Sequence, residues 1–231
     1  MTNRTPLDVL DAIHSTRAMR YLKPDPIPDE VLWDILDAAI CGPTGGNMQG
    51  WGWVVVRDPD RKREIGAWYL GYMEAMYGGF SADDLTGGQR AVYETGSGTA
   101  TWVARSTDVG VDDRNYRAAM HLAHHLADVP VIVFPVLHGG GPLSSILGAV
   151  QNLMLAARAF GIGSVLAGAP PHVDEILGLP QGVSGVSVMV PLGYPARGDF
   201  SQPKRRPVEQ VVHWERWGEQ TGRPSRGAPS R

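Results

Sequence analysis

Residues 42–51, Gly-Pro-Thr-Gly-Gly-Asn-Met-Gln-Gly-Trp, limit the fold of this chain more than any other stretch. Glycine permits left-handed backbone and proline lacks an amide donor, so this composition predicts a turn and excludes a continuous helix or strand. The turn separates a helical pattern from an apolar run that begins at Trp51. It contains no side chain suited to be a strong acid, base or nucleophile, so any function it has should be binding.

The spacing of apolar residues predicts the other elements. We expect helices over residues 6–15, 30–39 after a cap at Asp29, 61–77, 116–128, 143–160 and 172–177. We expect strands over 51–56, 129–136 and 183–192, and a short strand bounded by glycines within 161–168. This order of helices and strands indicates an α+β or α/β domain.

Two of these elements carry a more specific expectation. The helix at 143–160 has an apolar face broad enough to contact two surfaces, so it should be the central helix of the domain. The strand at 129–136 contains Pro130 and Pro135, which favour the rim or an end of the sheet.

Residues 78–115 lack a clear periodic pattern because glycines interrupt short polar and aromatic pieces. This stretch is too long for a plain loop in a compact domain, so we expect short helices that form a cover. Trp102 and Tyr116 are candidates to line a substrate cavity under the cover, and an equal alternative is that they only attach it to the core. We therefore expect one domain over 1–217 and a disordered tail over 218–231.

The charge balance and the cysteine content exclude several classes of protein. With 21 basic and 24 acidic residues the net charge is -3, which gives nucleic-acid binding no overall support. The single cysteine, Cys41, cannot form an internal disulfide, and no signal-peptide pattern or membrane-spanning run is present, so we expect a soluble cytoplasmic protein. Motifs of nucleotide-fold dehydrogenases, phosphoryl-transfer enzymes and serine hydrolases are absent from the sequence.

Three polar features remain as candidate sites. Arg17 and Arg20 suit an anion site because the guanidinium fork matches phosphate oxygens, although a solvated turn explains them equally well. His121 and His125 are four apart on a helix, a spacing that can chelate zinc, but no accompanying glutamate or cysteine completes a metal motif and we expect no metal. Gln151 interrupts an apolar helix and needs a hydrogen-bond partner.

Taken together, the order of five segments resembles the nitroreductase family of flavin enzymes. The segments are Thr16-Arg17-Ala18-Met19-Arg20 with the proline-rich stretch after it, Pro43 to Gln49 before Trp51, Ala149 to Ala157, Gly161-Ile162-Gly163-Ser164, and Lys204-Arg205-Arg206-Pro207 leading to Val211-Val212-His213-Trp214. Their occurrence in this order, from residue 7 to residue 217, makes the resemblance specific.

The resemblance implies a nitroreductase-like α+β fold with a central, mostly antiparallel sheet wrapped by helices. It also implies an interlocked homodimer with one FMN in each of two clefts at the interface. The residues implied to contact FMN are Arg17, Ala18, Arg20, Pro43, Thr44, Gly45, Asn47, Gln49, Gln151, Leu166, Ala167, Gly168, Lys204 and Arg205. Among them the basic residues would hold the phosphate, and the turn at 43–49 would come from the other subunit.

Three positions depart from the family pattern. Thr16 and Ala18 stand where many relatives have arginine and serine, so one charge and one hydroxyl contact to the phosphate are missing. Gly50 replaces the usual proline, which we expect to loosen the turn. FMN binding should therefore depend more on Arg17, Arg20 and Arg205.

The implied function is an FMN-dependent oxidoreductase. NAD(P)H would pass hydride to flavin N5, and a nitroaromatic, quinone or similar acceptor would then take its place in the same cleft, so no protein residue need be catalytic. Two alternatives remain open: a flavin storage or sensing protein, and a specialised enzyme that destroys flavin or removes halogen. A deazaflavin donor in place of NAD(P)H also remains open.

Overall fold

The computed structural model describes residues 7–77, 113–170, 172–205 and 207–222. The expected short helices within 78–112, and Trp102 with them, lie outside these residues, as does the tail from residue 223. Residues 218–222 are described and contain no helix or strand.

The apolar runs form the strands of one antiparallel sheet. The strands are β1 (Trp51–Val56), β2 (Val131–His138), β3 (Gly163–Ser164), β4 (Ala167–Gly168), β5 (Val183–Gly185) and β6 (Val188–Gly193). The main order is β1-β2-β6-β3, with β4 on β6 and β5 on β2, and each of these pairings is antiparallel. The expected α+β class with a mostly antiparallel sheet is therefore confirmed.

The prediction that prolines place 129–136 at the rim or an end of the sheet was wrong. Strand β2 lies between β1 on one side and β5 and β6 on the other. Pro135 is tolerated because it sits where the neighbour of β2 changes from β6, which pairs up to Val133, to β5, which pairs from Val136. The carbonyl of Pro135 accepts a bond from Val186 N on that side, so its missing amide also faces this break in the ladder.

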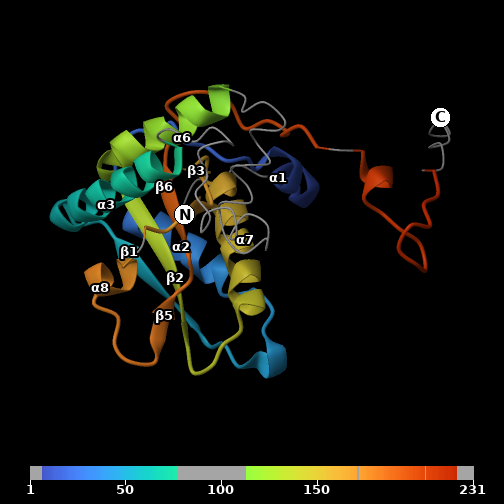
Figure 1. Cartoon of the computed structure of the whole chain (residues 1–231), viewed down its shortest axis with the longest axis horizontal. Helices are drawn as coiled ribbons and strands as arrows, with labels where there is room; N and C mark the ends of the chain where they lie inside the picture. Colours follow the sequence, from blue (N-terminus) through green and yellow to red (C-terminus); the bar gives the residue numbers. More distant parts are fainter. Residues whose placement is uncertain (1–6, 78–112, 171, 206, 223–231) are drawn as a thin grey trace, which may run out of the picture.

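Helices cover both faces of the sheet (Figure 1). On β2, Val131 and Val133 point to a core shared with α2 (Asp29–Ala39) and α7 (Leu143–Ala159), whereas Ile132 and Phe134 point to a core shared with α3 (Pro59–Tyr77) and α6 (Asp113–His125). The alternation follows from the two-residue period of a strand. The expected central helix is α7, which contacts α2, β2 and β3.

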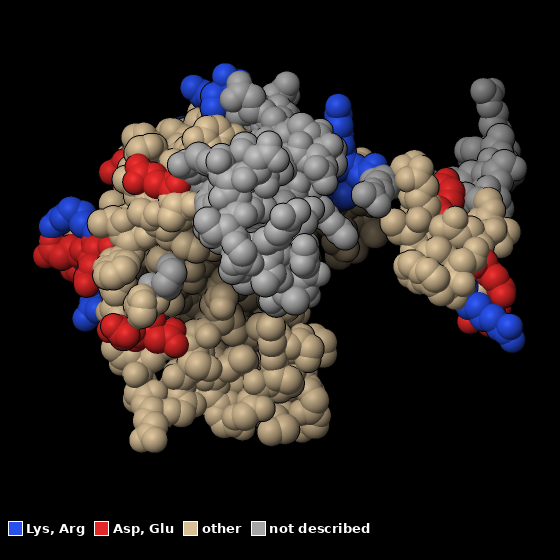
Figure 2. All heavy atoms as spheres, in the orientation of Figure 1, with Lys and Arg blue, Asp and Glu red and all other residues tan. Residues whose placement is uncertain are grey.

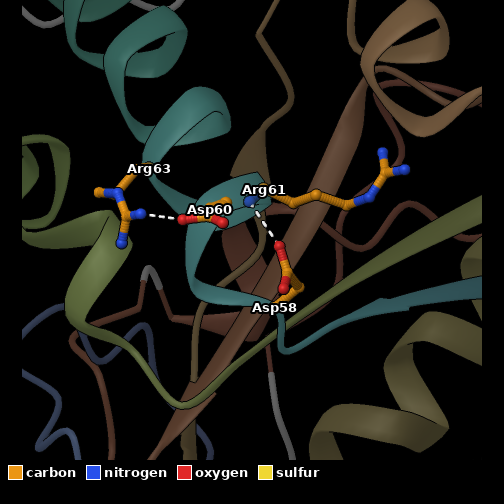
Figure 3. A network of polar contacts seen from close by, with 4 residues as sticks. All are labelled: Asp58, Asp60, Arg61 and Arg63. Atoms are coloured by element: carbon orange, nitrogen blue, oxygen red, sulfur yellow. Dashed lines mark hydrogen bonds and ion pairs between the residues drawn. The ribbon is translucent and has the colours of Figure 1, made fainter.

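The starts of two helices differ from expectation. Residue Asp29 is the first residue of α2 rather than its cap, because Pro28 occupies the cap position, and the Asp29 carboxylate instead pairs with Arg57. In α3 the helix begins two residues earlier than expected, at Pro59. The Asp58 carboxylate accepts a 2.9 Å bond from the backbone amide of Arg61, and Figure 3 shows this cap beside the ion pair of Asp60 with Arg63.

Smaller elements complete the described chain. They are α1 (Val9–Ser15), α8 (Val173–Leu177) and the short 3-10 helices Gly45–Asn47, Leu126–Asp128 and Val208–Gln210. After β6 the chain forms an arm, described over residues 201–205 and 207–222, that extends away from the body of the molecule (Figure 1). Among the described residues, no helix combines the length and apolar character needed to cross a bilayer.

Candidate functional site

The predicted anion segment, residues 16–20, forms an extended strip against β3. Ala18 makes a parallel bridge with Ser164, and the backbone amide of Met19 donates a 2.9 Å bond to the carbonyl of Ser164. Because alternate residues of an extended strip face opposite ways, buried Met19 anchors it while Ala18 and Arg20 lie on the other face. Gly163 permits this approach, since a Cβ there would lie 2.9 Å from Met19 Sδ.

The first predicted arginine meets the start of the arm. Arg17 Nη1 donates a 2.9 Å bond to Ser201 Oγ, and Lys204 and Arg205 follow three and four residues later, both exposed. Figure 2 shows basic side chains where the arm leaves the body of the molecule. The fold thus places the start of the arm against the predicted anion segment.

Arg158, which the sequence analysis did not single out, joins these segments to α7. Its Nε donates a 3.0 Å bond to Ser15 Oγ, and its guanidinium lies 4.0 Å from the ring centroid of Phe200. Burial lowers the pKa of Arg158, and the charge of Asp11 opposes that effect. An arginine in the last turn of a helix is so common that no sequence signal marked this one.

Thr16, which stands where many relatives have arginine, uses its hydroxyl in a hydrogen bond to α1. Thr16 Oγ1 donates a 2.7 Å bond to the carbonyl of Ala12, one helical turn back. This local bond turns the hydroxyl toward the helix end and away from a ligand role.

The predicted glycine turn is fixed at its ends and exposed in its middle. A Cβ on Gly42 would lie 2.8 Å from the backbone nitrogen of Ala149, and one on Gly50 would lie 2.8 Å from the carbonyl oxygen of His138. Gly50 is buried, so the expectation that it loosens the turn was wrong: it is required for a close backbone approach. A proline at this position would meet the same obstruction.

Backbone in the left-handed region shapes the middle of the turn. Asn47 and Gln49 have φ of 54° and 49°, next to Gly46 at 58°. Thr44 Oγ1 accepts a 3.3 Å bond from the Gln49 amide, and Gln49 Nε2 donates a 3.2 Å bond to Asn47 Oδ1. The residues Pro43, Gly45, Asn47 and Gln49 are exposed in this turn.

The glycine turn and the end of α1 contact different parts of α7. The turn packs on Gly148 and Ala149, whereas Arg158 holds the end of α1. Ten residues of helix separate these contacts, which is about 15 Å. In Figure 1, α1 and the segment that leads from α2 to β1 lie toward different ends of α7. Gln151 is exposed and lies one helical turn from Gly148.

The third predicted part of the site is at β4. Leu166 is exposed, and Ala167 and Gly168 pair with Met189 and Val188 of β6. The position of a Cβ on Gly168 would be 3.8 Å from the Tyr72 ring. The backbone of β4 is therefore close to α3.

The two predicted helical histidines form part of a stack of rings. The ring of His121 stacks on the ring of Tyr21, with centroids 4.1 Å apart, and its centroid lies 4.4 Å from that of His125. The guanidinium of Arg197 lies 4.5 Å from the centroid of the Tyr21 ring. Burial is the main cause that lowers the pKa of His121. Within the described residues, no group of three histidine, cysteine, aspartate or glutamate side chains is arranged to hold a metal ion.

Of the two residues assigned to the substrate cover, only Tyr116 can be placed. It lies on α6, which spans Asp113–His125 and is followed by a 3-10 turn, close to the expected helix at 116–128. Trp102 lies outside the described residues.

The profile of the nitroreductase family matches residues 13–194. The chain belongs to the nitroreductase family. A protein of Thermus thermophilus named NADH dehydrogenase is 30% identical over 210 residues, which cover 90% of this chain and 96% of that protein. Iodotyrosine deiodinase 1 of Rattus norvegicus is 24% identical over 221 residues, covering 87% of this chain and 67% of that protein.

Solved structures of nitroreductase-like proteins share the fold. An iodotyrosine deiodinase bound to FMN and 3-iodo-L-tyrosine has a TM-score of 0.65 at 21% identity, covering 91% of this chain and 100% of that one. A nitroreductase with bound FMN from Desulfitobacterium hafniense has a TM-score of 0.61 at 20% identity, with the same coverage. The family expected from the sequence is confirmed, and the chain is an oxidoreductase of this flavoenzyme family.

Proposed function

We propose that this chain is an FMN-dependent oxidoreductase that takes electrons from NAD(P)H and passes them to a nitroaromatic, a quinone or a similar electron-poor acceptor. The observation that carries the proposal is the contact between Arg17 and Ser201, because it brings the anion segment and the basic arm to one position. A phosphate dianion at that position would meet Arg17 and the basic residues Lys204 and Arg205 of the arm, whose donors suit its oxygens.

The residues near β4 fit a flat ring system. Ala167 and Gly168 carry a methyl group or no side chain at all, so their backbone is accessible to a flat ligand. Bound FMN would supply two-electron redox chemistry, so the protein needs only to bind and orient the reactants. This requirement agrees with a site whose predicted contacts are backbone groups and cations.

A complete site requires two copies of the chain. In one copy, the contacts of the glycine turn on α7 lie about 15 Å along the helix from the contact of Arg158 beside the anion segment, and the resemblance to the family implies that the turn of a second subunit completes the site. The turn presents Asn47 and Gln49 outward, and the arm carries exposed Val208, Val211, Trp214 and Trp217. Apolar residues on an arm outside the body favour burial against a second subunit.

The proposed overall reaction is balanced with water as the proton source. NAD(P)H gives up a hydride, which carries two electrons and one proton, and a quinone gains two electrons and two protons to become the hydroquinone. The second proton comes from solvent. No described side chain is required to act as an acid or base at the site.

The visible spectrum of the purified protein tests this proposal. We expect flavin absorbance that NADH or NADPH bleaches under anaerobic conditions and that a nitroaromatic or menadione restores. A colourless protein that added FMN does not reconstitute would exclude the proposal. A flavin that no nicotinamide donor reduces would favour a storage or sensing protein, or a deazaflavin-linked enzyme.

A second candidate is reductive dehalogenation of an aromatic compound, which the similarity to iodotyrosine deiodinase favours. In that reaction a hydride replaces the halogen, so an aryl iodide and NAD(P)H give the arene, iodide and NAD(P)+. Release of iodide from 3-iodotyrosine, measured with an iodide electrode, separates the two candidates. The candidate fails if the reduced protein turns over quinones but releases no iodide.

A further inference from the structure

We propose that a groove along α3 binds the aromatic ring of the electron acceptor, an inference that rests on the proposed function. The groove is lined by Ala67, Trp68, Gly71, Tyr72 and Ala75 and has a volume of about 490 Å³. This volume falls within the range of small-molecule sites, about 300–1,000 Å³. None of these lining residues is charged, so the chemistry suits an uncharged ring.

The shape of the groove follows from the helical repeat. The small residues Ala67, Gly71 and Ala75 are four apart and lie on one stripe of α3, while Trp68 and Tyr72 form a second stripe beside it. The small stripe makes a floor and the aromatic stripe makes a wall. A flat ring can therefore lie on the floor with its face or edge against the wall.

Within the described part of the chain, no close contact requires the glycine at the centre of the floor. A Cβ on Gly71 would meet no atom of the described residues within 4 Å, whereas a Cβ on Gly66 in the same helix would lie 3.4 Å from the Ala127 backbone. Glycine inside a helix costs about 1 kcal/mol relative to alanine. At Gly66 the close packing against Ala127 offsets that cost. At Gly71 the missing side chain instead leaves space above the helix.

The groove lies beside the backbone that is proposed to meet the flavin ring. Its Tyr72 ring is the nearest group to Gly168 of β4, at 3.8 Å from a Cβ placed there. At its other end, Trp68 lies 6.0 Å from the ring of His172, at the start of α8. Trp68 is 49% exposed, so part of its ring is open to contact with a ligand.

Filling the groove at Gly71 tests the inference. Gly71→Leu adds bulk above the floor, and Gly71→Ala is the matched control because alanine and leucine have similar helix propensity. We expect Gly71→Leu to raise the KM for menadione and for 4-nitrobenzyl alcohol about tenfold or more, and Gly71→Ala to change it about twofold at most. Reduction of ferricyanide, which does not need an aromatic pocket, should be the same in both variants.

Calorimetry without a nicotinamide donor gives a second readout. We expect 4-nitrobenzyl alcohol to bind the oxidised wild-type protein, and Gly71→Leu and Trp68→Ala to weaken that binding about tenfold. Equal binding by wild type and Gly71→Leu would overturn the inference. So would a raised KM for NADH with an unchanged KM for both aromatic acceptors, because that result assigns the groove to the donor.

Failure of this inference is distinguishable from failure of the proposed function. If wild type and Gly71→Leu both contain FMN and are bleached by NADH but use aromatic acceptors equally well, only the groove assignment fails. If neither can be loaded with FMN, the proposed function fails, and calorimetry with the aromatic compound still tests the groove.

Discussion

Arg17 Nη1 donates a 2.9 Å hydrogen bond to Ser201 Oγ across 184 residues of sequence. The bond places an arginine after the first helix beside a basic arm near the end of the chain. Arg158 supports the same region through Ser15 and Phe200. This arrangement is the basis of the proposed phosphate site.

Removal of the Arg17 guanidinium should weaken FMN binding. A hydrogen bond to a charged group contributes about 1.5–3 kcal/mol, so we expect Arg17→Ala to raise the Kd for FMN about 10- to 100-fold. Fluorescence titration of the apoprotein with FMN measures this change. Arg63→Ala, at an exposed ion pair on α3, is the control and should leave the Kd unchanged. Equal affinities of Arg17→Ala and wild type would exclude the assigned role.

The contact between β3 and the anion segment should be sensitive to one methyl group. Gly163→Ala places a Cβ 2.9 Å from Met19 Sδ and 3.2 Å from Met19 Cβ, so we expect a loss of about 1–3 kcal/mol in the free energy of unfolding and weaker FMN binding. Gly71→Ala, where space is open, should stabilise slightly. Urea unfolding of both variants checks the difference. A Gly163→Ala protein as stable as wild type would show that the segment is not held by this contact.

Stability should fall when the pH is lowered through the range in which His121 titrates. Burial, then His125, Arg197 and His124, lower the pKa of His121, while Asp128 opposes them. The unfolded chain therefore takes up a proton at a higher pH than the folded chain does. The stability that neutral His121 contributes to the folded state is fully present above about pH 6.5, the ordinary histidine pKa, and is lost as the pH falls below it.

The variant His121→Phe keeps a ring on Tyr21 but cannot titrate. We expect its Tm to fall less than the Tm of wild type between pH 7.5 and pH 5.5. Differential scanning calorimetry at both pH values measures the two changes. An equal fall in Tm in the two proteins would show that titration of His121 does not cause the loss of stability.

The arm should support association of two chains. Deleting residues 207–231 removes Val208, Val211, Trp214 and Trp217, which are exposed in one copy, the last to 89%. We expect the deletion to shift the protein toward monomer in sedimentation velocity and to lower its flavin content. A truncated protein with the association state of the full chain would show that the arm has another role.

Much of the fold could be predicted from local patterns. Apolar periodicity identified α7, and β-branched runs identified β1, β2 and β6, because these signals arise from burial on one or two faces. The error at Pro135 arose because a proline within a strand indicates a broken ladder, and the sequence does not show that the break lies between two successive neighbours of a central strand.

The candidate site was less accessible to sequence reasoning. Residue types and order indicated Arg17, the glycine turn and the basic arm, but the position of α7 between the turn and Arg17 depends on tertiary packing. Arg158 was missed because its partner, Ser15, is far away in the sequence. Gly50 was misinterpreted because the backbone that it approaches, at His138, is also far away in the sequence. The groove on α3 depends on open space above Gly71, which a sequence does not record.

The central claim is that each site combines the anion segment of one subunit with the glycine turn of the other. Two defective chains test it: Arg17→Glu/Arg20→Glu, which cannot hold the phosphate, and Asn47→Leu, which obstructs the turn. Asn47→Gly is the control for the turn, because glycine accepts the φ of 54° without a side chain.

The decisive measurement is the FMN content of a heterodimer of these two chains, isolated with two affinity tags under conditions in which each parent homodimer is free of flavin. A shared site leaves one of the two clefts with both parts intact, so we predict about one FMN per heterodimer. A site contained in one chain would leave every cleft with one defect. A heterodimer as free of flavin as its parents, or failure of the two chains to associate at all, would contradict the account.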